Sequence, residues 1–243
     1  MHDLSTPLMT LRNCLSLLSG HVSEQGKPLL DVMEQNVAAL RRNVSALATT
    51  LDADITVSAS TAVNLCDAVT AVTGQLAPGL ADEGAPKLVC SLKDSPIVFA
   101  NGLSLERALL NLISNALQHC KSTVTVSALC EEGFGVLRVA DDGPGIAVQD
   151  MPHILTPWFT TGSPGSGLGL CMVDQFARLS GGRLDVENRD GAVFTLRLPL
   201  PDKLNLSAVR PDETHLSPAL IHYELALTLA RRAGKNAPDF SLF

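Results

Sequence analysis

The strongest constraint on the fold is a heptad repeat that runs twice through the first 52 residues of the chain. Apolar side chains recur at alternating intervals of four and three, first over residues 4–22 and again over residues 30–51, with Gly26 and Pro28 between the two runs. This spacing places one apolar seam on each of two helices, and Pro28 suits the first turn of the second helix. We expect a helical hairpin. Because two helices alone cover such seams poorly, we expect two copies to form a dimeric four-helix bundle.

His2 stands at the start of the first helix, beside Asp3 and four residues before Thr6. At about 100° per residue, His2 lies on the side opposite the apolar seam, and Thr6 shares that exposed side. From these residues alone, two interpretations stay open. The group is either accessible to a second protein or domain, or it is a polar helix start in which Asp3 interacts favourably with the helix macrodipole.

Beyond residue 53, helices and short strands interleave without regular βαβ alternation. The pattern predicts helices over 65–77, 102–120 and 167–180, strands over 87–92 and 97–100, a hairpin of 123–130 with 134–140, and a closing hairpin over 183–198. This order favours an α+β sandwich in which one mixed sheet carries helices on one face. A last helix, starting near Ser217, has apolar residues on two sides, and we expect it to pack back on this domain.

Composition excludes several classes of function. The 243 residues are 46% apolar, the net charge is −7, and no run of Lys and Arg stands out, so we expect no nucleic-acid partner. No apolar run approaches the roughly 20 residues that cross a bilayer, so we expect a cytoplasmic location and no membrane contact by this segment. The six cysteines lie far apart with no CxxC pair, which predicts reduced, mostly buried thiols and no metal cluster.

The segment ERALLNLISNALQHC carries a polar side on an otherwise apolar helix. Asn111, Asn115, Gln118 and His119 fall together, opposite the apolar arc. Two amide oxygens at i and i+4 suit a hard divalent cation such as Mg²⁺ that also binds phosphate oxygens. A solvated polar helix face is the alternative from the residues alone.

The segment RVADDGPGI runs from a strand straight into an acidic turn. Asp141, at the strand end, can accept a hydrogen bond from an exocyclic amine, while Gly143 and Gly145 let the backbone approach a flat ring. The same letters also occur in ordinary turns.

The segment PWFTTGSPGSGLGL places Gly165, Gly167 and Gly169 at the opening of a helix. Free backbone N–H groups and the helix dipole favour phosphate at such a position. Trp158 and Phe159 are expected to anchor the start of this loop in the core.

Taken in order, MHDLSTPL, NLISNALQH, DDGPGI, PWFTT and GSGLGL resemble the H, N, first glycine, F and second glycine boxes of bacterial sensor histidine kinases of two-component systems. The resemblance covers about residues 1–200. It implies a dimerisation and phosphotransfer hairpin of the HisKA type over residues 1–52 and an ATP-binding catalytic domain over residues 53–200. That domain would be an α/β sandwich of the Bergerat type, as in the GHKL ATPases, and residues 201–243 would form a partly helical C-terminal extension.

The resemblance also implies roles for individual residues. His2 would accept the phosphoryl group, Asp3 would take up its proton, and Thr6 would orient water for dephosphorylation of a partner. Asn111 would act in catalysis near the phosphates, and Asn115 would hold Mg²⁺. The residues expected to contact ATP are Asn111, Asn115, His119, Asp141, Gly143, Gly145, Ile146, Thr161, Gly165, Ser166, Gly167, Leu168 and Gly169.

The expected function is ATP- and Mg²⁺-dependent autophosphorylation of His2 in a homodimer, followed by transfer to an aspartate in the receiver domain of a response regulator. Gln118 and Gly162 stand where relatives carry lysine, so ATP affinity is expected to be about tenfold lower or more.

Two alternatives remain: an ATP-independent phosphotransfer adaptor with a degenerate nucleotide site, and an ATPase or serine kinase that shares only the nucleotide fold. Because almost nothing precedes His2, we expect the chain to be a fragment of a longer sensor, either membrane-bound or soluble.

Overall fold

The computed structural model describes residues 60–82, 84–160 and 167–201, together with single positions at Lys27, Met33, Val37, Ile221, Leu225, Thr228 and Leu229. Within this part of the chain, no helix has the length and apolar character needed to cross a membrane.

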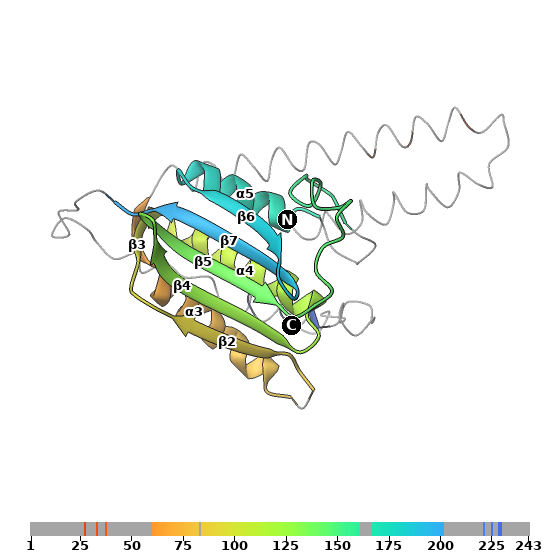
Figure 1. Ribbon diagram of the computed structural model, residues 1–243, viewed down its shortest axis with the longest axis horizontal. Coiled ribbons are helices and arrows are strands. Elements are labelled where there is room, and N and C mark those ends of the chain that lie inside the picture. The colour runs from red at the N-terminus through yellow and green to blue at the C-terminus, as the bar shows by residue number, and fades with distance from the viewer. Residues whose placement is uncertain are drawn as a thin grey trace.

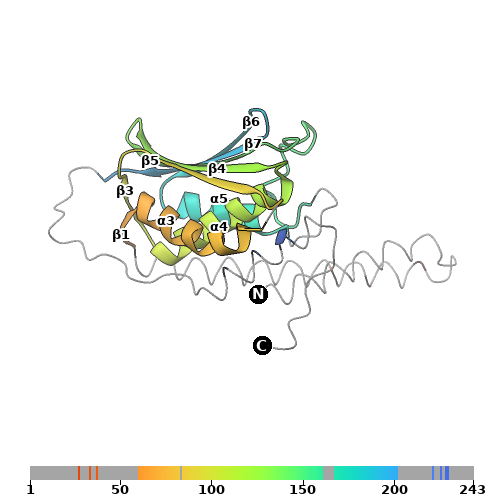
Figure 2. The ribbon, with the colours of Figure 1, turned by 90° about the horizontal axis from the view of Figure 1, so that it is seen from below.

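The described elements form two layers, a sheet and the helices that cover one of its faces (Figures 1 and 2). The helical elements are α3 (Leu65–Leu76), the short 3₁₀ helix η1 (Ala77–Leu80), α4 (Gly102–His119) and α5 (Gly169–Leu179). The strands are β1 (Thr61–Asn64), β2 (Lys87–Leu92), β3 (Ile97–Ala100), β4 (Thr123–Glu131), β5 (Phe134–Asp141), β6 (Arg183–Asn188) and β7 (Ala192–Pro199).

The main sheet has five strands in the order β2-β4-β5-β7-β6. β2 runs parallel to β4, and every other pair is antiparallel, so the predicted mixed sheet is confirmed. The turn between β4 and β5 consists of Glu132 and Gly133, both with positive φ, as a two-residue hairpin requires. Alternate residues of β4, from Val124 to Ala128, are buried against the helices.

The sequence did not predict β1, and it placed all the strands in one sheet. β3 instead pairs with β1 in a separate two-stranded sheet, in which Thr61 lies opposite Ala100. A four-residue strand is too short to show alternation, and its partner lies far along the chain, so the local pattern carries little signal for it.

The core lies between the helices and the main sheet. Its largest fully buried side chains include Leu105, Leu109 and Leu112 of α4 and Phe194 and Leu196 of β7. These residues recur at helical spacing in α4 and at every second position in β7, which is why one face of each element is apolar. The apolar side of α4 faces this core. The last residue of α4, His119, lies beside the end of β5.

Two positions of the C-terminal extension belong to this same core. Ile221 is fully buried and Leu225 is 3% exposed, and both are helical. Leu225 packs so closely on Gly79 of η1 that a Cβ on this glycine would overlap its side chain. The expectation that this segment packs back on the domain is confirmed at these positions. The domain boundaries proposed at residues 52 and 200 stay predictions.

Three positions of the predicted N-terminal hairpin are described. Met33 and Val37 are helical, as the heptad pattern predicts for the second helix, and Lys27 is helical too, although it lies in the segment expected to separate the two helices. Val37 is buried, whereas Met33, in the same predicted seam, is 47% exposed. The dimeric bundle stays a prediction.

Five of the six cysteines lie in the described part of the chain, and all five are free thiols. The expectation that they are mostly buried is wrong, because only Cys120 is buried while Cys90 and Cys130 are exposed. Cys90 lies in the edge strand β2, and Cys130 is the second-last residue of the neighbouring strand β4.

Candidate functional site

The polar side of α4 forms one margin of the site. The helix starts at a cap in which Asn101 Oδ1 accepts the backbone N–H of Ser104 at 2.9 Å. Asn111, Asn115 and His119 follow at intervals of four and are each half-buried, so they lie along the boundary between core and surface. The predicted helix face is therefore confirmed as a single row of polar side chains.

Asp141 ends β5 and is only 7% exposed. Its Oδ1 atom accepts the backbone N–H of Gly143 at 2.8 Å and that of Ala192 at 3.3 Å. Both bonds use the same oxygen, so within the described residues Oδ2 remains available to a donor on a ligand. A buried carboxylate held in this way suits recognition of an amino group.

Gly143 brings the end of α4 against this carboxylate. A Cβ at Gly143 would overlap the backbone oxygen of His119 and would lie 2.7 Å from Asp141 Oδ1. Only glycine allows this approach. Burial lowers the pKa of His119, and the neighbouring Asp141 acts in the opposite direction, so the imidazole is neutral at pH 7.

Asp142, the next residue, holds the loop between α4 and β4. Its carboxylate accepts the hydroxyl and backbone N–H of Ser122 and the backbone N–H groups of Thr123 and Lys121, at 2.6–3.1 Å. These hydrogen bonds depress the pKa of Asp142 far below its ordinary value, and the Ser122 hydroxyl contributes most. The two acidic residues therefore differ in role, since Asp141 faces the site while Asp142 fixes a loop.

The N-terminus of α5 forms the opposite margin. No described side chain caps this helix, whereas Asn64 caps α3 and Asn101 caps α4. The start of a helix is a position whose backbone N–H groups and dipole favour an anion. A Cβ at Gly169 would lie 3.4 Å from Asn111 Oδ1, which places the start of α5 beside the polar row of α4.

The loop before α5 is closed at its base. The backbone N–H of Trp158 donates to the carbonyl of Gly167 at 2.7 Å, and Gly167 has a φ of +66°. A Cβ at Gly167 would overlap the backbone of Trp158, so glycine is needed there. Phe159 packs against the core as predicted, and Trp158 contributes through its backbone to this base.

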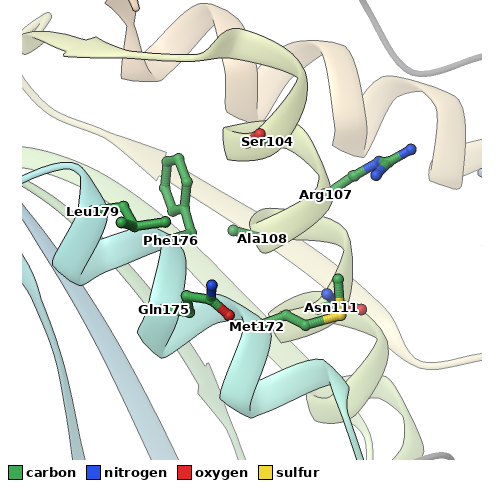
Figure 3. A pocket seen from close by; sticks show the side chains of 8 residues that line it. All are labelled: Ser104, Arg107, Ala108, Asn111, Met172, Gln175, Phe176 and Leu179. Atoms are coloured by element: carbon green, nitrogen blue, oxygen red, sulfur yellow. The ribbon is translucent and has the colours of Figure 1, made fainter. Parts of the chain in front are cut away.

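A groove between α4 and α5 extends from Asn111 and Met172 at one end to Ser104 and Leu179 at the other (Figure 3). Met172 of α5 points toward Asn111, and Arg107 of α4 points away from α5. Of the residues predicted to bind a nucleotide that the structure describes, only Asn111 lines this groove. It is therefore distinct from the region around Asp141.

Asn111 lies beside Gly169 at the start of α5, and His119 and Gly143 lie beside Asp141 at the end of β5. Asn115 lies on α4 between Asn111 and His119, Gly145 and Ile146 follow in the loop after Asp141, and Gly167 and Leu168 directly precede α5. His2, Asp3, Thr6, Thr161, Gly165 and Ser166 lie outside the described residues, as does Gly162. Sequence reasoning missed Asp142 as a loop clamp and Asn188, whose side chain contacts Ile146. The acidic pair before the glycines was a signal for Asp142, but no local pattern marks Asn188.

Comparison with known proteins agrees with this arrangement. Residues 100–202 match the family described as histidine kinase-, DNA gyrase B-, and HSP90-like ATPase. The chain is 31% identical to the sensor histidine kinase ZraS of Escherichia coli over 82% of its own length and 44% of the relative. It is 28% identical to the sensor protein CutS of Streptomyces coelicolor, over 82% of the chain and 50% of the relative. The chain therefore spans half or less of the length of these relatives.

Among solved structures, the fold resembles that of full-length ShkA in complex with AMPPNP. The TM-score is 0.55 at 22% identity, and the match covers 82% of this chain and 44% of ShkA. Residues 100–202 form a domain of the histidine kinase-, gyrase- and HSP90-like ATPases. Over four-fifths of its length, the chain is similar to a bacterial sensor histidine kinase and to a bacterial sensor protein.

Proposed function

We propose that this chain is the core of an ATP-dependent protein histidine kinase that acts in the cytoplasm as a homodimer. The observation that carries the proposal is the pairing of a buried carboxylate, Asp141, near His119 with the N-terminus of α5 at Gly169, which no described side chain caps, near Asn111 of the same polar row. The first group suits the amino group of adenine, and the second suits phosphate. ATP is a ligand that has both.

At the adenine end, Asp141 Oδ2 would accept the exocyclic amine. Gly143 and Gly145 would allow the ring to lie close to the backbone, and Ile146 would contact its apolar face. His119, whose depressed pKa keeps it neutral, would line the site without offering a fixed charge. Recognition would thus rest on shape and on one carboxylate.

At the phosphate end, the backbone of the loop through Thr161, Gly165, Ser166, Gly167 and Leu168 would enclose the phosphates, and Gly169 would stand at the positive end of the α5 dipole. Asn111 would lie beside the terminal phosphate, since its amide adjoins Gly169. An amide is a poor base, so this position favours transfer to a protein nucleophile over transfer to water.

The residues fit a magnesium ion that arrives with ATP. The described part of the chain has no group of three His, Cys, Asp or Glu side chains able to hold a metal alone, whereas the half-buried Asn115 amide on α4 offers a hard oxygen ligand. Bound beside the phosphates, Mg²⁺ would neutralise their negative charge.

In the reaction, the neutral imidazole of His2 would attack the γ-phosphorus of ATP, and the bond to the bridging oxygen would break, so that ADP leaves. Asp3 would take up the imidazole proton. The phosphoryl group would then pass to an aspartate of a response regulator receiver domain, and Thr6 would orient water to hydrolyse that aspartyl phosphate. The comparisons described above do not support the adaptor alternative.

The test is incubation of the purified chain with magnesium and γ-labelled ATP. We expect label that is stable to base and labile to acid, absent from a His2→Gln variant, and transferable to a receiver domain. Acid-stable label, or equal label in the variant, would instead indicate a serine kinase or chemistry elsewhere.

A further inference from the structure

The amide side chain of Asn188 bonds both backbone groups of Ile146. Asn188 is the last residue of β6. Its Oδ1 accepts the Ile146 N–H at 2.9 Å, and its Nδ2 donates to the Ile146 carbonyl at 2.8 Å. These two residues are 42 positions apart in the sequence. Both ends of the amide are used, so its orientation is fixed, and an isosteric aspartate would lack the donor.

Gly145 adjoins this contact and has a φ of +72°. A Cβ there would lie 2.9 Å from Asn188 Oδ1, so the amide lies directly against the Gly145 backbone. The loop after Asp141 is therefore tied down twice, at Gly143 by the Asp141 carboxylate and at Ile146 by Asn188. The residues between and beyond these ties, Pro144 and Ala147, are exposed.

We propose that Asn188 is a positioning residue for nucleotide binding, and this inference rests on the proposed function. Asn188 acts through Ile146: it holds residues 143–146 in the conformation that receives adenine before ATP arrives. Without the second tie, the loop would have to be ordered during binding, and that entropy cost would reduce affinity. The phosphates are held by other elements, α4 and α5, so the chemical step would not change.

The experiment compares wild type with Asn188→Ala, which removes both bonds, and Asn188→Asp, which removes the donor and sets an oxygen against the Ile146 carbonyl. The matched control is Asn64→Ala. The Asn64 side chain also accepts a backbone N–H at 2.9 Å, but it caps α3 at the end of the domain where Leu65 bonds to Pro96. ATP affinity is measured by calorimetry, KM and kcat by autophosphorylation, and folding by thermal denaturation.

We expect both Asn188 variants to bind ATP about tenfold more weakly, with KM raised and kcat unchanged, and Asn64→Ala to bind as wild type does. Affinity within twofold of wild type in both Asn188 variants, or an equal loss of affinity in Asn64→Ala, would overturn the role of Asn188 and leave the proposed function standing. Absence of ATP binding by wild type would overturn the proposed function and this inference with it.

Discussion

The first residue of α5 lies against the first asparagine of the polar row: a Cβ at Gly169 would be 3.4 Å from Asn111 Oδ1. A branched side chain at Gly169 would extend beyond this Cβ and crowd the Asn111 amide and the start of α5. We therefore expect Gly169→Val to bind ATP at least about tenfold more weakly, as measured by calorimetry.

The matched control for this substitution is Gly74→Val. Gly74 lies inside α3, and nothing lies within 4 Å of the place its Cβ would take. It should bind ATP as wild type does. Equal affinities for the two variants would show that the start of α5 does not contact the phosphates.

His119 should make stability depend on pH. Burial lowers its pKa in the folded chain, so the unfolded chain binds the proton first as pH falls below about 6.5. Stability is therefore unaffected well above this value and decreases below it. In urea titrations at pH 7 and pH 5, wild type should lose more stability than His119→Gln. A loss of equal size in both proteins would exclude this group as the cause.

Asp142 should make stability depend on pH in a more acidic range than His119 does. Its pKa is depressed by bonds to Ser122 and the neighbouring backbone, so its contribution to stability is fully present above the ordinary value of about 4. The contribution is lost as pH falls through the lower folded value. Asp142→Asn should therefore have a lower urea midpoint than wild type at pH 7, and the difference should shrink in acid. A constant difference would contradict a charge-based clamp.

The C-terminal extension should contribute to the stability of the domain. Leu225 is 3% exposed and packs on Gly79, so Leu225→Ala should lower the free energy of unfolding by about 2–5 kcal/mol. Leu179→Ala is the control, since Leu179 is 45% exposed and its loss should cost about 0.5 kcal/mol or less. The free energies of unfolding are measured by chemical denaturation. Similar losses in Leu225→Ala and Leu179→Ala would show that the extension does not belong to the core.

The elements predicted well from the sequence are those with local signals. α4 is predicted at 102–120 and found at Gly102–His119, because an apolar arc of five turns is hard to mistake. The hairpin of β4 and β5 follows from alternation on both sides of the Glu132-Gly133 turn. Asp141, at the end of that hairpin, could be singled out for the same reason.

What the sequence could not predict depends on contacts between distant segments. An asparagine at the end of a strand, such as Asn188, is common and gives no signal of a special role. Only the folded structure brings Asn188 into contact with Ile146. The pairing of β1 with β3 is likewise non-local. The separate roles of Asp141 and Asp142 depend on which groups donate hydrogen bonds to each carboxylate. The local sequence does not specify these donors.

The most direct test of the central claim is calorimetric titration of the wild-type chain and Asp141→Asn with ATP in the presence of magnesium. The substitution replaces the buried, charged carboxylate with a neutral amide. The adenine amine then loses a charged hydrogen-bond acceptor. We predict saturable one-site binding by wild type and a loss of about tenfold or more in the variant. Absence of binding by wild type at millimolar ATP, or equal affinity in both proteins, would contradict the account.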